Sequence, residues 1–310
     1  LFFALPTKRN DGTRYIRDLY ARGVRNFVVS EERLNEVGIG EPKVEDAARQ
    51  ETADTAAMQP AFNLLVVPNP LKALQKLAEQ HRDRFQIPVI GITGSNGKTI
   101  VKEWLHQLLS PERMITRSPR SYNSQIGVPL SVWQMSEQTE LAILEAGISE
   151  PGEMRALQNI IKPTIGILTN IGGAHQENFF SLQEKCMEKL ALFKNCDVVI
   201  YNGDDEFINN CVGKSMLANL PILAWSRKDM ERPLYISKVE KQEDFTVISY
   251  RYLDMDNTFT LPFIDDASIE NSLNCLAACL YLMLPAEQIT ERMAKLEPVA
   301  MRLEVKEGKN

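Results

Sequence analysis

Short, uninterrupted apolar runs recur through most of the chain, and stretches with helical spacing of apolar positions lie between them. Such runs are typical of strands that are buried on both faces of a parallel sheet. Between residues 85 and 298 they predict strands at Val89–Ile92, Met114–Thr116, Leu141–Glu145, Ile165–Thr169, Val198–Tyr201 and Ile222–Trp225. Strands that alternate with helices predict an α/β fold, with a mostly parallel sheet and helices on both faces.

The end of this region has a different pattern. Residues Tyr235–Phe263 alternate between apolar and polar positions without a helical stretch, which predicts an antiparallel meander. Two closing helices are expected at Ser268–Leu284 and Ala286–Leu296. Met301–Asn310 is typical of a linker that leads into another domain.

The first 84 residues predict a smaller α/β domain, with strands at Leu1–Leu5, Phe27–Val29 and Leu64–Val67 and helices at Asp11–Arg22 and from Pro70 onward. The acidic stretch 31–62 has no clear period, so we expect a loop or insertion with one short helix and assign it no function. The chain starts with an apolar segment instead of Met, and we expect a truncated N-terminus. The predicted domains are an incomplete N-terminal domain (1–84), a central domain (85–298) and a linker to a missing C-terminal domain (299–310).

The composition fits a globular protein of about two domains and argues against several classes. Of the 310 residues, 44% are hydrophobic and 25% are charged, and the net charge of −6 argues against nucleic acid as a main partner. The longest apolar run, Cys275–Leu284, is too short to cross a bilayer, so we expect no membrane insertion. The five cysteines form no Cys-x-x-Cys pair and there are only three histidines. We therefore expect no zinc site, and the cysteines are typical of reduced core residues in a cytoplasmic protein.

The stretch Ile87–Thr99 carries the strongest candidate chemistry. A predicted strand leads into three glycines spaced three residues apart, then into Lys98, Thr99 and an amphipathic helix. Glycines allow backbone N–H groups to turn toward a phosphate, and the helix N-terminus adds partial positive charge. Lys98 can then reach the β- and γ-phosphates of a nucleotide, and the Thr99 hydroxyl can bind Mg²⁺. The alternative is a glycine-rich turn with a surface lysine, which the order of strand, loop and helix disfavours.

Two charged residues stand where apolar residues are expected. Glu145 ends a predicted buried strand, where a carboxylate could bind Mg²⁺; the alternative is an ordinary strand-end glutamate. The segment Ser181-Leu-Gln-Glu184 is a capping box that predicts the start of a helix, and Lys189 lies in the middle of the apolar stripe of that helix. A buried lysine has to be deprotonated, paired or modified, unless its ammonium group reaches the surface.

The loop has the spacing Gly-x-x-Gly-x-x-Gly-Lys-Thr, with Ile92 where a strict P-loop has glycine, and it resembles that of the Mur ligase family. Enzymes of this family use ATP to join an amine to a carboxylate. The resemblance implies that Glu145, in a Glu-x-Gly motif, binds Mg²⁺ together with Thr99. It also implies a P-loop central domain in which ATP is bound by Gly94, Ser95, Asn96, Gly97, Lys98 and Thr99.

A second metal site is implied by another family motif. Asn170 and His175 match a run of Asn-x-x-x-x-His whose histidine contacts the second metal, and Lys189 follows His175 by fourteen residues. In many family members a lysine at that position reacts with CO₂, and the resulting carbamate binds the second Mg²⁺. The resemblance therefore implies that His175 and Lys189 bind metal and that Lys98, His175 and Lys189 are catalytic.

Further matches concern the substrates. Asn123 and Ser124 lie in a loop similar to the family's Asn-Asn-x-x-Gly-x-Pro run, which faces the acyl phosphate, so together with Asn170 they are expected to bind substrate. Asn271 matches an asparagine that binds adenine, and Arg302 matches a hinge arginine that contacts the phosphates of ATP.

The N-terminal segments Phe2–Gly12 and Leu65–Gln75 resemble the family's nucleotide-sugar-binding domain. They are most similar to the members that add D-alanyl-D-alanine to UDP-N-acetylmuramoyl-tripeptide. The resemblance thus implies these two substrates, ATP and Mg²⁺ as cofactors, and a role in peptidoglycan synthesis in the cytoplasm. Some relatives are fused to an alanine racemase, which could also hold for the parent of this chain.

Three alternatives remain open from the sequence. Another Mur-type or a folylpolyglutamate-type ligase would have the same motifs. A switch GTPase would need an Asn-Lys-x-Asp motif to read guanine, which the sequence lacks. A non-catalytic ATP-binding fragment is the third, because the family's C-terminal domain, which brings the amine substrate, would lie beyond Asn310. For that reason we expect at most trace ligase activity from this chain alone.

Overall fold

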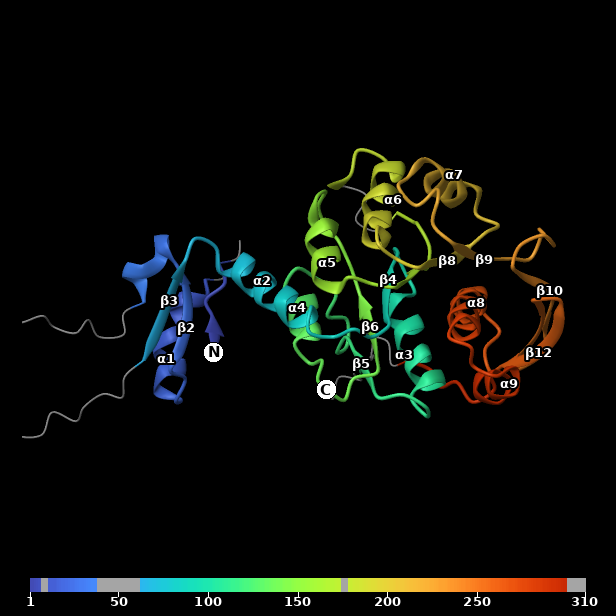
Figure 1. Cartoon of the computed structure of the whole chain (residues 1–310), viewed down its shortest axis with the longest axis horizontal. Helices are drawn as coiled ribbons and strands as arrows, with labels where there is room; N and C mark the ends of the chain where they lie inside the picture. The colour runs from blue at the N-terminus through green and yellow to red at the C-terminus, as the bar shows by residue number, and fades with distance from the viewer. Residues whose placement is uncertain (7–10, 38–61, 174–177, 300–310) are drawn as a thin grey trace, which may run out of the picture. The chain divides into compact units, whose positions relative to one another are not determined.

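The computed structural model describes residues 1–6, 11–37, 62–173 and 178–299 of the chain. The chain divides into two compact units, Leu1–Leu77 and Ala78–Asn310. The division falls inside helix α2, Pro70–Arg82 (Figure 1). Each unit has its own sheet; the first unit has one hydrophobic core and the second has a core on each face of its sheet.

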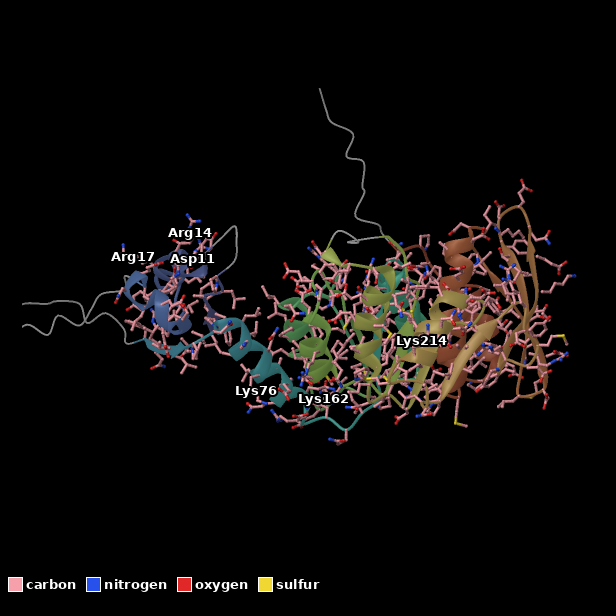
Figure 2. All side chains as sticks on the ribbon, turned by 90° about the horizontal axis from the view of Figure 1, so that it is seen from above. Asp11, Arg14, Arg17, Lys76, Lys162 and Lys214 are labelled. Atoms are coloured by element: carbon pink, nitrogen blue, oxygen red, sulfur yellow. The ribbon has the colours of Figure 1, made fainter. Side chains whose placement is uncertain are left out.

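The first unit is a small three-stranded parallel sheet in the order β1-β2-β3, formed by Phe2–Phe3, Asn26–Ser30 and Asn63–Val67. The predicted helix after Asp11 begins as a 3₁₀ helix, η1 (Gly12–Tyr15), and continues as α1 (Ile16–Ala21). The Asp11 carboxylate accepts a hydrogen bond of 2.9 Å from the backbone N–H of Thr13, which fixes the start of this helix. Figure 2 shows Asp11 on the same segment as Arg14 and Arg17.

The acidic stretch contains one short helix where the structure describes it. This is the 3₁₀ helix η2, Glu31–Glu36, which follows β2 directly. Residues 38–61 lie outside the described part of the chain. The predicted short helix is therefore confirmed for the beginning of the stretch.

The second unit contains, within its described residues, a nine-stranded sheet in the order β12-β11-β10-β9-β8-β7-β4-β6-β5. Every pair from β5 to β10 along this order is parallel, and β10, β11 and β12 pair antiparallel, so the predicted meander is confirmed. The strands are β4 Val89–Thr93, β5 Ile115–Arg117, β6 Leu141–Glu145, β7 Ile165–Leu168, β8 Val198–Asn202, β9 Ile222–Ser226, β10 Leu234–Lys241, β11 Thr246–Tyr252 and β12 Met255–Leu261.

Helices cover both faces of this sheet, as predicted, because alternate residues of each parallel strand belong to different cores. Ile90 and Ile92 pack in one core with α3 (Lys98–Leu109), α8 (Asp266–Tyr281) and α9 (Ala286–Met293). Val89 packs in the other core. The helices on that face are α4 (Gly127–Val132), α5 (Glu153–Ile161), α6 (Leu182–Leu190) with the 3₁₀ turn η4 (Ala191–Phe193), and α7 (Glu206–Lys214).

The last residues of α2 are anchored in the second unit by a buried arginine. Arg82 is 6% exposed and donates hydrogen bonds to the carbonyls of Ile161 (2.9 Å), Phe85 (2.6 Å) and Lys162 (3.1 Å). These include carbonyls at the C-terminal end of α5, which have no partner within the helix. Lys162, labelled in Figure 2, ends α5 in a left-handed conformation and forms an ion pair with Asp83.

Two observations concern membrane-spanning helices and the cysteines. The helices of the described part of the chain are all too short or too polar to cross a membrane. All five cysteines are buried free thiols, and burial raises the pKa of Cys279 to about 12.

Candidate functional site

The glycine-rich loop connects the end of β4 at Thr93 to the start of α3 at Lys98, at the C-terminal edge of the parallel strands. Gly94 and Gly97 have positive φ angles of +147° and +81°, where side chains are strained. A Cβ atom on Gly94 would also lie 1.9 Å from the Thr169 hydroxyl oxygen, and one on Gly97 would lie 2.3 Å from Asn271 Oδ1. Both positions therefore require glycine for this loop conformation.

The end of β7 holds the loop in place. Ser95 donates its backbone N–H to the carbonyl of Asn170 (2.9 Å), and Asn96 donates its backbone N–H to Asn170 Oδ1 (3.0 Å). The Thr169 hydroxyl donates to the Asn96 carbonyl (2.5 Å). The side-chain amide of Asn170, which the sequence suggests for substrate binding, is thus engaged with the loop.

Lys98 folds back over the loop and donates to the Gly94 carbonyl at 2.9 Å. Burial lowers the pKa of Lys98; Glu145 acts in the opposite direction and Lys185 adds to the lowering. The first N–H groups of α3 have no intrahelical partner and point along the helix axis toward the same region. The loop therefore offers a lysine and backbone donors to an anion.

Thr99 and Glu145 place two oxygen atoms beside the loop, where both could act as metal ligands. Glu145 ends β6 with its side chain fully buried, and its Oε2 lies 3.2 Å from Thr99 Oγ1 and 3.4 Å from Asn123 Nδ2. Two oxygens bound at right angles to one Mg²⁺ lie about 2.9 Å apart, because each bond is about 2.0–2.1 Å long. The pair therefore fits a hard cation. No group of three or more His, Cys, Asp or Glu side chains suited to a metal occurs among the described residues.

Lys189 of α6 also lies beside the glycine-rich loop, and it is buried, as its position in the apolar stripe of α6 predicts. Its side chain is 3% exposed and donates to the Gly94 carbonyl at 3.2 Å, so Lys98 and Lys189 converge on one oxygen. Burial, followed by the charges of Lys98 and Lys185, lowers the pKa of Lys189 to about 7. The other expected metal ligand, His175, and the expected phosphate contact, Arg302, lie outside the described residues.

A cavity of about 120 Å³ joins these groups. It brings together the loop, the expected substrate residues and two helix α6 lysines: its lining is Gly94, Ser95, Lys98, Asn123, Ser124, Gly147, Ile148, Ser149, Lys185 and Lys189. Ser124 also accepts a hydrogen bond of 3.1 Å from the Gly127 N–H and so fixes the start of α4. Three lysines in one small cavity suit an anionic ligand.

Two buried lysines near this cavity were not singled out from the sequence. Lys185 precedes Lys189 by one turn of α6, is 2% exposed and donates to the Gly172 carbonyl at 2.5 Å. Lys102, one turn after Lys98 in α3, is fully buried and lies 3.1 Å from Glu145 Oε1. Neither lysine gave a clear signal in the sequence, because the residues three and four positions away on its helix are mostly polar.

Asn271, expected to bind adenine, lies on α8 and is 5% exposed. Its carboxamide packs against Gly97, so it contacts the loop directly. The neighbouring Glu270 lines a second cavity of about 580 Å³, and burial raises the pKa of its carboxyl group. That cavity is also lined by Asn202, Asp204, Asp205, Trp225, Arg227 and Lys228.

A buried parallel strand, a glycine-rich loop with Lys-Thr and an amphipathic helix, with a carboxylate at the end of the adjacent strand, define a P-loop α/β protein. The Mur ligase middle domain matches residues 92–279, and the chain belongs to the Mur ligase family.

Individual relatives agree with this assignment. The chain is 30% identical over 248 residues to UDP-N-acetylmuramoyl-tripeptide–D-alanyl-D-alanine ligase of Bacillus subtilis, covering 78% of this chain and 52% of that protein. It is 32% identical over 275 residues to the enzyme of the same name from Rickettsia prowazekii, covering 85% and 54%. The chain therefore spans about half the length of these curated relatives.

Solved structures show the same fold. MurF from Acinetobacter baumannii superposes with a TM-score of 0.79 and 21% identity, covering 96% of this chain and 60% of that one. MurF from Thermotoga maritima in complex with ADP gives a TM-score of 0.77 and 23% identity, covering 99% and 65%. The predicted α/β architecture, with its small N-terminal sheet and its mixed central sheet, is confirmed.

Proposed function

We propose that this chain is the nucleotide- and carboxylate-binding part of an ATP-dependent ligase that adds D-alanyl-D-alanine to UDP-N-acetylmuramoyl-tripeptide. The names of the relatives from Bacillus subtilis and Rickettsia prowazekii support this choice within the family. The observation that carries the proposal is the lysine-lined cavity, in which the glycine-rich loop, Asn123 and Lys189 face one another.

In the proposed reaction a carboxylate oxygen of the tripeptide attacks the γ-phosphorus of ATP, which gives an acyl phosphate and ADP. The amine of the dipeptide then attacks the acyl carbon and loses a proton, and the tetrahedral intermediate expels phosphate to leave the amide. Both steps concentrate negative charge on oxygens between the two reactants. Lys98, held at the loop, would offset the charge on the transferred phosphoryl group.

Mg²⁺ would be held by Thr99 and Glu145, whose oxygens have a suitable separation, and it would neutralise phosphate charge and align the reactants. The protein's own contribution is the position of the donors. Thr99 is in the first turn of α3 and Glu145 ends the neighbouring strand β6, so both belong to rigid elements. Asn123 donates toward the same Glu145 oxygen and would face the acyl group.

Lys189 is proposed to carry a carbamate. The neutral Nζ amine would attack CO₂, forming an N–C bond and releasing one proton, which converts a buried cation into an anion. The low pKa of Lys189 supports this step, because only the neutral amine reacts. The carbamate and His175 would serve as ligands of a second Mg²⁺.

The remaining assignments follow from the same proposal. Asn271 and Arg302 would contact ATP, while Ser124 and Asn170 would contact the substrate directly or through the loop. The first unit would bind the UDP-sugar, residues 299–310 would lead to a C-terminal domain, and the whole enzyme would act in the cytoplasm. A fused alanine racemase in the parent protein stays a prediction.

The test is calorimetric titration of the 310-residue chain with Mg-ATP and, separately, with UDP-N-acetylmuramoyl-tripeptide. Lys98→Ala should weaken Mg-ATP binding by at least about tenfold, because a charge-assisted contact to phosphate is lost. The matched control is Lys194→Ala, which changes an exposed lysine just after α6 and η4 and should keep the original affinity. Equal affinities of the Lys98→Ala variant and the original chain would contradict the nucleotide assignment.

A second measurement addresses the reaction itself. We expect the chain alone to yield no more than a trace of amide when it is mixed with ATP, tripeptide precursor and D-alanyl-D-alanine. Product with a different amine or a different carboxylate would indicate another Mur-type or a folylpolyglutamate-type ligase. Rapid amide formation by this chain would show that no further domain is needed.

A further inference from the structure

Lys102 is the least expected charged residue near the site. It lies on α3 three residues after Thr99, and its side chain is fully buried. Its ammonium donates hydrogen bonds to the carbonyl of Ser118 (2.7 Å) and to that of Arg120, and it forms ion pairs with Glu103 Oε1 (3.0 Å) and Glu145 Oε1 (3.1 Å). Three of these four partners lie outside α3, and only Glu103 belongs to the same helix.

Stability alone does not account for this arrangement. Removing a lysine and a glutamate from water costs several kcal/mol, and a buried ion pair is often no more stable than apolar residues of similar volume. The neighbours of Lys102 in α3, among them Val101 and Leu105, belong to a well-packed apolar core that a methionine would suit. The ammonium group is therefore best explained by what it does to its partners.

The two oxygens of Glu145 have different surroundings. Oε2 lies near the Thr99 hydroxyl and the Asn123 amide, which is the side of the proposed Mg²⁺. Oε1 is buried and lies next to the Lys102 ammonium, but it accepts no well-aligned hydrogen bond from the described residues. Attraction to the ammonium thus favours the orientation in which one carboxylate oxygen faces Lys102 and the other faces Thr99.

Lys102 also organises the backbone that leads to Asn123. Arg120 has a φ of +48°, a left-handed conformation that is strained for arginine, and its carbonyl points to the ammonium. Ser118, whose carbonyl also binds the ammonium, accepts a hydrogen bond of 3.1 Å at its hydroxyl from the Glu145 backbone N–H. The segment 118–120 therefore contacts the backbone of Glu145 directly, through the Ser118 hydroxyl, and the side chain of Glu145 indirectly, through the Lys102 ammonium.

We propose that Lys102 is a positioning residue that orients Glu145 and the 118–123 segment so that one carboxylate oxygen, Oε2, is presented to Mg²⁺. The inference rests on the proposed Mg-nucleotide function of the site. It predicts a specific defect: without the ammonium group, the protein still folds and still binds nucleotide, but it holds the divalent cation less well.

The test uses the 310-residue chain with Lys102→Met, which keeps the length of the side chain and removes its charge. Binding of Mn²⁺, as a probe for Mg²⁺, to the chain saturated with ADP is measured by electron paramagnetic resonance. ADP affinity without divalent cation is measured by calorimetry. We expect Mn²⁺ affinity to fall about 10-fold or more, as is typical when a residue that orients a metal ligand is removed, and metal-free ADP affinity to change less than about 2-fold.

Two further variants keep the result interpretable. Lys194→Met, an exposed lysine, is the matched control and should leave both affinities unchanged. Ser118→Ala removes a neutral contact to the same glutamate and should lower Mn²⁺ affinity in the same direction but by less, and it tests the idea if Lys102→Met does not fold.

The outcomes separate the two proposals. A folded Lys102→Met chain with the original Mn²⁺ affinity, or an unfolded one accompanied by an unaffected Ser118→Ala chain, would refute the positioning role. An equal loss of metal-free and metal-dependent ADP binding would also refute it, because it would show a general collapse of the loop. If the original chain binds neither ADP nor Mn²⁺–ADP, the proposed function itself fails.

Discussion

Replacing Lys189 by methionine should stabilise the second unit, and the gain should depend on pH. Lys189 is 3% exposed, and its pKa is lowered from 10.5 to about 7, first by burial and then by the charges of Lys98 and Lys185. In the unfolded chain the amine stays protonated up to about pH 10.5. Between pH 7 and pH 10.5 the unfolded state therefore binds a proton that the folded state does not, and stability rises with pH.

The size of the effect follows from the shift. One pKa unit corresponds to about 1.4 kcal/mol. A shift from 10.5 to about 7 therefore means that, below pH 7, the buried Lys189 ammonium lowers the free energy of unfolding of the original chain by at most about 5 kcal/mol. Local relaxation and water penetration reduce this to about 2–3 kcal/mol in practice. The methionine variant also loses the 3.2 Å hydrogen bond to the Gly94 carbonyl, worth about 1 kcal/mol at every pH. The gain at pH 6.5 should thus exceed the gain at pH 9.5 by about 2–3 kcal/mol.

The assay is urea unfolding in CO₂-free buffer, followed by tryptophan fluorescence. All three tryptophans, Trp104, Trp133 and Trp225, lie in the second unit, so the signal reports that unit alone. Lys194→Met provides the control and should show no pH-dependent difference. Bicarbonate at pH 8 should stabilise the original chain and leave Lys189→Met unchanged, and isotope-labelled CO₂ should give a carbamate carbon signal only in the original chain.

One result would refute the reasoning. If the original chain and Lys189→Met have parallel stability curves from pH 6.5 to pH 9.5, the Lys189 ammonium is hydrated or paired in solution. The buried neutral amine, and with it the physical basis for carbamate formation, would then be wrong.

Three other predictions use different parts of the chain. Gly97→Ala should reduce nucleotide affinity by more than about tenfold, because its Cβ would meet Asn271 and its φ of +81° costs an alanine about 1–2 kcal/mol; Gly213→Ala, in open space, is the control for calorimetry. Arg82→Met should lower the free energy of unfolding by about 3 kcal/mol, since three buried carbonyls lose a charged donor, whereas the exposed Arg84→Met should not; an equal effect of both would contradict this. All five thiols should resist Ellman's reagent until urea unfolds the chain, and a fast-reacting cysteine would contradict their burial.

The strands and several helix starts could be predicted because they depend on local patterns. β4 is buried at every position, so its apolar run is visible in the sequence. The capping box at Ser181 is confirmed, since its hydroxyl accepts the Glu184 N–H at 3.0 Å and the Glu184 carboxylate accepts the Phe180 N–H at 2.8 Å. The start of α8 is two residues earlier than predicted because Asp265 caps it, and β5 is displaced by one residue.

The parts of the site that could not be predicted depend on which strands are neighbours. The hydrophobic pattern does not say that β6 lies between β4 and β5, and this order is what brings Glu145 to Thr99 and Lys102. Lysine is common on helix surfaces, so Lys102 carried no local signal until its partner was placed. The engagement of Asn170 with the loop likewise depends on β7 lying beside β4.

The same strand order also bears on when the site forms during folding. The hydrogen bond between Thr99 and Glu145 joins residues 46 apart, and the one between Lys189 and Gly94 joins residues 95 apart. Closing such long loops costs chain entropy before any contact is gained, so contacts of this kind form slowly. Lys102 and Glu145 can form their ion pair only when β6 lies between β4 and β5, so the cost of removing Glu145 from water is offset only once these strands are assembled. A chain that has collapsed without β6 in place therefore has the glycine-rich loop and its lysine but no carboxylate beside them.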